Sequence, residues 1–278
     1  MRLVLVRHLW GVTEPPEICL PRFKSLGFDG IAAPTSVMEP AQATQFHAVR
    51  RDLGLGWIMQ DFTCLWERGR SVEDHLTSLR RMFRVAKEQG AILLNVHGGA
   101  DDWRLADMIR YHREAQRMAA DAGIPMAHET HRGRCLYSPW TTREIIEAVP
   151  EVTLTVDFSH WTVVAERLLE DQSEIIRLAA DRAVHIHARV GYENGPQVPD
   201  PRAPEYANAV ACHERWWNWC WESMSARGIS EVFLTPEFGP GSYLHHLPFT
   251  NVPVADLDAI CTWQAHRQRD RFQKRFQK

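Results

Sequence analysis

Acidic and histidine side chains recur along the chain, each directly after a short apolar run. One group from each of four successive runs stands out: Glu129, Asp157, His187 and Glu237. Three carboxylates and one imidazole suit a hard or borderline divalent cation such as Mn, Mg, Co or Zn, and no cysteine stands among them. The set therefore predicts one divalent metal ion, provided that the fold brings the four side chains together.

Further histidines occupy the same positions relative to the apolar runs. Seven of the 14 histidines fall there: His8, His97, His128, His131, His160, His185 and His187. Burying so many ionisable groups together would be costly unless they were paired or bound to a metal. Side chains alternate along a strand, so His185 and His187 share a face and either could ligate a metal. We favour His187, because it lies nearer the end of its run.

The apolar runs are predicted to be the strands that position these groups. Eight β-rich runs alternate with longer amphipathic stretches: 2–6, 28–33, 57–62, 91–97, 125–131, 152–158, 183–190 and 232–238. Their mean spacing of about 33 residues is close to that of a (β/α)8 barrel. The sequence therefore predicts an α/β fold, a (β/α)8 TIM barrel that forms a single domain over residues 1–278. In such a barrel the C-terminal strand ends converge on one pocket, where the polar groups would meet.

Helix signals separate the predicted strands. Ser71 and the pair Asp101–Asp102 precede two amphipathic stretches, and Thr141–Glu144 resembles a capping box. Residues 191–204, rich in Pro and Gly, follow the seventh strand. We expect them to form a loop or lid lining the site, because active sites lie at this face of the barrel.

The ordered set of motifs resembles a known family. Glu129, the Asp157-x-x-His160 motif, the His185-x-His187 motif and Glu237 are similar to the xylose isomerase-like superfamily, which includes ketose 3-epimerases, dehydratases and an abasic-site endonuclease. The resemblance implies that Glu129, Asp157, His187 and Glu237 bind one divalent metal. It also implies that His160 contacts substrate, and Arg189, His97 and His131 are further candidates for substrate binding. Ketose 3-epimerases usually carry an arginine several residues beyond the strand-seven histidine, whereas here Arg189 stands only two beyond His187, so the substrate stays open.

The resemblance also implies a reaction. A divalent metal that chelates a carbonyl and a neighbouring hydroxyl favours an enediolate, and Glu129 and Glu237 would be the acid and base that move the proton. A sugar or keto-sugar isomerase or epimerase is the first hypothesis, and a dehydratase or lyase acting on a keto-sugar or cyclitol is the second. An endonuclease of the abasic-site type and a non-catalytic sugar-binding barrel remain as further alternatives.

Composition limits the partners of the protein. The formal charge is only -3, from 32 Lys and Arg against 35 Asp and Glu, so no net basic field attracts nucleic acid or an anionic membrane. Six scattered cysteines suit a reducing cytoplasm, and no apolar run reaches the roughly 18 residues of a membrane span. We expect a cytoplasmic protein with a small, sugar-like substrate. The aromatic segment 216–221 is predicted either to pack a helix on the barrel or to form a homo-oligomer interface.

Overall fold

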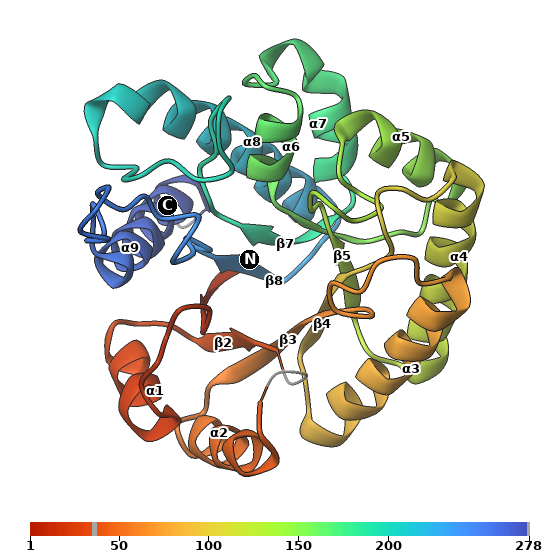
Figure 1. The fold of residues 1–278 in the computed structure, drawn as a ribbon, viewed down its shortest axis with the longest axis horizontal. Coiled ribbons are helices and arrows are strands. Elements are labelled where there is room, and N and C mark those ends of the chain that lie inside the picture. Colours follow the sequence, from red (N-terminus) through yellow and green to blue (C-terminus); the bar gives the residue numbers. More distant parts are fainter. Residues whose placement is uncertain (35–37, 277–278) are drawn as a thin grey trace.

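The protein is an eight-stranded parallel barrel, as the spacing of the apolar runs predicts (Figure 1). The computed structural model describes residues 1–34 and 38–276. The strands pair in chain order and close between first and last: β1 (Arg2–His8), β2 (Gly30–Ala33), β3 (Gly56–Phe62), β4 (Leu93–His97), β5 (Met126–Glu129), β6 (Leu154–Val156), β7 (Ala183–His187) and β8 (Glu231–Thr235). Closure leaves none of these strands with an unpaired edge.

Helices surround the barrel (Figure 1). In the described residues they are α1 (Pro16–Ser25), α2 (Pro40–Asp52), α3 (Val72–Gln89), α4 (Leu105–Ala122), α5 (Pro139–Ala148), α6 (Phe158–Val164), α7 (Ser173–Ala180), α8 (Ala207–Ala226) and α9 (Leu257–Phe276), with short 3-10 helices η1 (Glu170–Gln172) and η2 (Pro204–Tyr206). Ser71 caps α3 as predicted, since its hydroxyl accepts from the Asp74 N–H. The prediction of a capping box at Thr141–Glu144 is wrong by one turn, because Ser138 caps α5 and accepts from the Thr141 N–H.

Several strands end earlier than predicted. The clearest case is β6, which ends at Val156 because the Asp157 side chain accepts from the Ser159 N–H and starts α6. β5 likewise ends at Glu129 and β8 at Thr235. Asp157 and Glu237 therefore follow their strands instead of belonging to them.

Apolar side chains fill part of the barrel interior, and the candidate polar groups lie at the C-terminal ends of the strands. Val4, Val6, Ala32, Ile58, Leu93 and Ala127 form one buried cluster. A much larger apolar layer lies between strands and helices, and Trp216, Trp217 and Trp221 of α8 belong to it. Of the two predictions for segment 216–221, packing of the helix on the barrel therefore explains the positions of these three tryptophans. A homo-oligomer interface stays a prediction.

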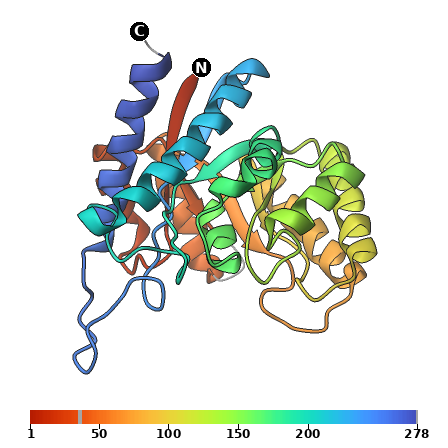
Figure 2. The same cartoon turned by 90° about the horizontal axis from the view of Figure 1, so that it is seen from above.

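The loops that follow the strands gather at one end of the barrel. Met1 and the end of α9 lie at the other end, as Figure 2 shows. Residues 191–204 lie at the loop end, where Gln197 donates to the Gly239 carbonyl and accepts from its N–H. Among the described residues, no helix is both long and apolar enough to cross a bilayer.

Candidate metal centre and cavity

The four predicted ligands meet at the loop end of the barrel. Glu129 ends β5, Asp157 follows β6, His187 ends β7 and Glu237 follows β8. Each offers one ligand atom, and these atoms all lie within 4.8 Å of one another. All four residues are buried. Parallel pairing around the barrel thus brings together groups that are more than 100 residues apart.

Neighbouring backbone and hydroxyl groups orient Asp157. Its Oδ1 accepts from the Ser159 N–H at 3.0 Å and from the Ser159 hydroxyl at 2.5 Å. Its own N–H donates to the Thr130 hydroxyl at 2.7 Å, which ties β6 to the end of β5. Oδ1 is therefore held by the start of α6, and Oδ2 faces the other charged groups.

Two cations lie among the three carboxylates. His187 Nδ1 is 2.9 Å from Glu237 Oε2 and 3.5 Å from Glu129 Oε2. Arg189 donates to Asp157 Oδ2 at 2.5 Å, and the same Nη2 lies 3.6 Å from Glu237 Oε2. Because the cluster is buried, these interactions are screened far less than they would be at the surface.

The pKa values follow from burial and from these pairs. Burial raises the pKa of Asp157 to about 6, although the charge of Arg189 opposes the rise. Burial also disfavours charge on His187, but the carboxylates of Glu237 and Glu129 raise its pKa to about 10. Burial acts against ionisation of Glu129 and Glu237 as well, yet the His187 charge helps to keep the pKa of each below its usual value. Both glutamates are therefore carboxylates at neutral pH.

The residues present fit a divalent metal ion. Glu129 Oε1 and His187 Nδ1 are buried without a well-directed hydrogen bond, and a ligated cation would satisfy both. Three carboxylates against the fixed positive charge of Arg189 leave two negative charges, which a divalent ion would balance once His187 is neutral. Oxygen-rich sets with one imidazole suit Mg or Mn, and Zn also accepts them.

The other predicted histidines take different places. His185 is not part of the ligand group: its ring lies between the hydroxyls of Thr155, at 3.2 Å, and Thr235, at 2.8 Å. His160 is fully buried, and its Nε2 lies 2.6 Å from Arg189 Nη2. His160 is not among the described residues that line the cavity, and its contact with substrate stays a prediction.

His97 and His131 do line the cavity beside Glu129. His97 Nε2 is 2.7 Å from Glu129 Oε2, and the His97 ring stacks on Phe62 with centroids 4.1 Å apart. The His131 ring meets the His97 ring edge-on at 4.9 Å. The stack and the edge contact hold both imidazoles in one orientation at the wall.

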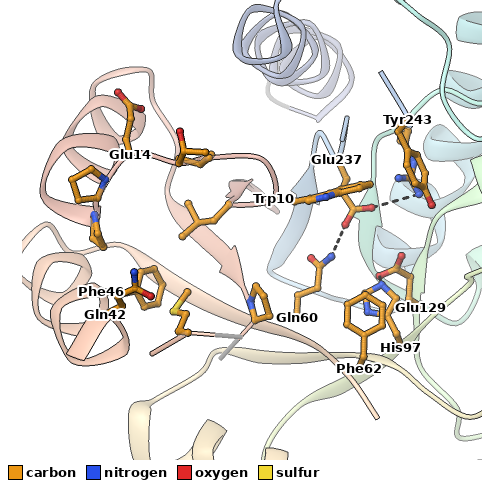
Figure 3. Close-up of a pocket in the computed structure, with 18 of the residues that line it drawn as sticks. Trp10, Glu14, Gln42, Phe46, Gln60, Phe62, His97, Glu129, Glu237 and Tyr243 are labelled. Carbon is orange, nitrogen blue, oxygen red and sulfur yellow. Dashed lines mark hydrogen bonds and ion pairs between the residues drawn. The ribbon is translucent and has the colours of Figure 1, made fainter. Parts of the chain in front are cut away.

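The cavity has a volume of about 790 Å³ and reaches the metal centre through Glu129, Glu237 and Arg189. Figure 3 shows Glu237 and Glu129 at one end, close to Tyr243 and His97. No residue of 191–204 is among the described residues that line it, so the prediction of a site-lining loop is wrong. That loop instead packs against Gly239 behind the wall, because Gln197 satisfies both backbone groups of Gly239.

Sequence reasoning missed two polar residues that hold the glutamates. Asn95 Nδ2 donates to Glu129 Oε2 at 2.8 Å, and Gln60 Nε2 donates to Glu237 Oε1 at 2.5 Å. Both stand inside apolar strands, and Asn95 shares a strand face with His97 two residues later. A polar residue within a buried strand was therefore the available signal. Tyr243, from the irregular segment after β8, carried no such signal.

Comparisons with known proteins agree with this architecture. The model of the xylose isomerase-like TIM barrel family matches residues 20–201, which is more than half of the chain. The chain therefore belongs to the xylose isomerase-like TIM barrel family. No curated protein sequence matches it.

Solved structures share the fold at low sequence identity. The IOLI protein with a bound zinc atom is 14% identical with a TM-score of 0.66, covering 98% of this chain and 99% of that one. D-allulose 3-epimerase from Methylomonas sp., in complex with D-allulose, is 14% identical with a TM-score of 0.60, covering 97% of both chains. A probable 3-DHS dehydratase, AsbF, from Bacillus anthracis is 13% identical with a TM-score of 0.60, covering 96% of this chain and 99% of that one. At these identities the likeness is one of fold.

Proposed function

We propose that the protein is a divalent-metal-dependent isomerase or epimerase of a sugar or keto-sugar. One observation carries the proposal: Glu129 and Glu237 line the same cavity, and the His187 imidazole lies between them at 3.5 and 2.9 Å. Because both carboxylates belong to the same candidate ligand group and line the same cavity, they can face a small substrate from two sides. Structural neighbours that act on sugars, such as the D-allulose 3-epimerase, support the substrate class.

Glu129, Asp157, His187 and Glu237 would hold the ion. A divalent ion bound there supplies a Lewis acid that favours enediolate formation from a carbonyl and its neighbouring hydroxyl. Glu129 would take a proton from the carbon beside the carbonyl, and Glu237 would return one. Return to the opposite face of the same carbon gives an epimer, and return to the adjacent carbon gives an aldose-ketose isomer.

Neighbouring groups tune this proton transfer. Asn95 and His97 both contact Oε2 of Glu129, which fixes the orientation of this carboxylate at the cavity. Gln60 and Arg189 hold the two oxygens of Glu237 in one orientation. Hydrogen bonds and ion pairs of this kind fix the direction in which each carboxylate presents its lone pairs.

A dehydratase is the second candidate, and the position of His97 favours it. Its imidazole lines the cavity 2.7 Å from Glu129, so His97 could protonate a leaving hydroxyl after Glu129 removes the proton. The probable dehydratase among the structural neighbours is consistent with this alternative.

Two measurements test the proposal. Metal content by mass spectrometry, on protein purified without a chelating column, should give about one Mn, Mg, Co or Zn ion per chain. NMR in heavy water should then show deuterium entering a keto-sugar. The product identifies the reaction: an epimer, an aldose-ketose isomer or a dehydrated sugar. Glu129→Gln and Glu237→Gln should each abolish the exchange. A protein that binds no metal on titration would refute the proposal, and about three zinc ions would favour the endonuclease alternative.

A further inference from the structure

The cavity is much larger than the metal centre requires. A free hexose displaces about 180 Å³, the space of roughly six water molecules, whereas the cavity measures about 790 Å³. Figure 3 shows where the remaining space lies: Glu14, Gln42 and Phe46 stand far from Glu129 and Glu237, toward α1 and α2. We call this second part, lined from the β1–α1 loop, from α2 and by Pro34 and Met38, the distal arm.

The distal arm is mainly apolar. Its apolar lining residues are Leu9, Val12, Pro15, Pro16, Pro34, Met38 and Phe46. Its polar lining consists mainly of Thr13, Glu14, Gln42 and Gln45. A surface of this kind gains free energy by covering hydrocarbon and offers little to the hydroxyl groups of a second sugar.

Among the described residues, none that lines the distal arm is a cation that could pair with a phosphate. Of the described residues that line the whole cavity, Arg189 is the only lysine or arginine. Arg189 already donates to Asp157 at 2.5 Å and to the Ser159 hydroxyl at 3.0 Å in the metal centre. Glu14 also lines the arm and pairs with Arg22, and a carboxylate at this position would repel a phosphoryl group.

One wall of the cavity is rigid where the two parts meet. The Trp10 ring lies against Gly239 so closely that a Cβ on that glycine would come within 2.2 Å of Trp10 Cζ3. The same ring meets Tyr243 edge-on with centroids 4.8 Å apart. A Cβ on Gly11 would likewise lie 2.6 Å from Pro240. The β1–α1 loop is thus packed on the segment after β8, so this wall is formed before any ligand binds.

From the size, lining and charge of the distal arm, we infer that the substrate is an unphosphorylated sugar conjugate whose aryl or alkyl group occupies the arm. The inference rests on the proposed function, because the sugar end of the conjugate would lie at the metal centre. An apolar arm suits such a group, and the packed Trp10 ring offers it a flat surface that need not reorganise on binding.

Calorimetric titration of the metal-loaded protein with three probes tests the inference: glucose, phenyl β-D-glucopyranoside and glucose 6-phosphate. Covering roughly 100 Å² of apolar surface should tighten binding by about tenfold to a hundredfold, so the phenyl glucoside should bind at least tenfold more tightly than glucose. Glucose 6-phosphate should bind no more tightly than glucose. Equal affinity for all three probes, or tightest binding of the phosphate, would overturn the inference.

Two charged variants locate the effect. Val12→Asp places a carboxylate in the arm and should reduce the preference for the phenyl glucoside at least fivefold. Gln42→Glu adds a second test, because a glutamate can keep the contact from the Glu39 N–H that caps α2. Ile18→Asp is the matched control, since Ile18 is 55% exposed in α1 and outside the cavity. An equal loss in the control would contradict the assignment to the arm.

The same experiments separate this inference from the proposed function. A protein that binds metal and exchanges deuterium, yet shows no preference for the phenyl glucoside, refutes the distal arm alone. A protein that keeps the preference but binds no metal on titration refutes the proposed function alone.

Discussion

Arg189→Met in the metal-free protein gives the sharpest test of the electrostatics in the centre. Arg189 is 1% exposed and donates to Asp157 at 2.5 Å and to Ser159 at 3.0 Å, with Glu237 at 3.6 Å. Methionine keeps much of the volume and removes the charge. Breaking a buried pair from one side typically costs about 3–5 kcal/mol, because the partner carboxylate is left in a low dielectric without compensation. We expect a loss of this size in the free energy of unfolding.

The matched control is Arg2→Met. Arg2 contacts Glu231 at 2.6 Å, nearly the same distance, but the two side chains are 57% and 48% exposed. Exposed pairs contribute at most about 1 kcal/mol. Urea unfolding with a chelator present measures both variants at equilibrium, and an unchanged slope would show that the unfolded states are comparable. Equal losses in the two variants would refute the argument that burial sets the energy of the Arg189 pair.

Three further predictions concern metal, pH and backbone packing. A divalent metal at a hundredfold excess over its Kd should raise the free energy of unfolding of the wild type by about 2.7 kcal/mol, seen as a higher Tm in a thermal melt. Asp157→Asn should abolish most of this increase. Burial lowers the pKa of His213 to about 4, so its neutral ring stabilises the fold above pH 6.5 and that contribution is lost as the pH falls toward 4. His213→Gln should therefore lessen the acid loss of stability between pH 6.5 and 4 by about 3 kcal/mol in urea titrations, and an unchanged slope would contradict this. Gly191→Ala should cost about 1–3 kcal/mol in urea unfolding, because its Cβ would lie 2.8 Å from the Ser159 backbone; a loss below 0.5 kcal/mol, on the order of a neutral surface change, would refute the clash.

The barrel was predictable because its strands are short and buried on both faces. Such strands appear as apolar runs whose spacing repeats, so their number and order could be inferred without any contact information. The strand ends were less predictable. Val156 and Phe158 are equally apolar and buried, and only the capping contact of Asp157 with Ser159 separates strand from helix there.

The convergence of the four candidate metal ligands was predictable for a related reason. Ionisable residues at the C-terminal ends of successive parallel strands must converge once the barrel closes, whatever their separation in the chain. The cavity wall depends on loops, which have no such rule. Trp10, Phe62 and Trp66 line the cavity, whereas Trp161 is buried with its ring N–H on the Leu136 carbonyl. The residue type alone therefore does not predict whether an aromatic side chain near a strand end lines the cavity or is buried.

Stability alone does not account for the charged cluster. Replacing a buried ion pair by well-packed apolar residues is often neutral or stabilising, so a barrel of this kind could be filled with hydrocarbon to its mouth. Apolar side chains, from Val4 to Ala127, do fill part of the interior, but polar groups occupy the end that holds the carboxylates. The cost of keeping Glu129, Asp157 and Glu237 ionised near one another is offset in part by Arg189 and His187. The two negative charges left beside Arg189, when His187 is neutral, are those that a divalent ion would balance, which is why metal binding and folding of this end of the barrel should be linked.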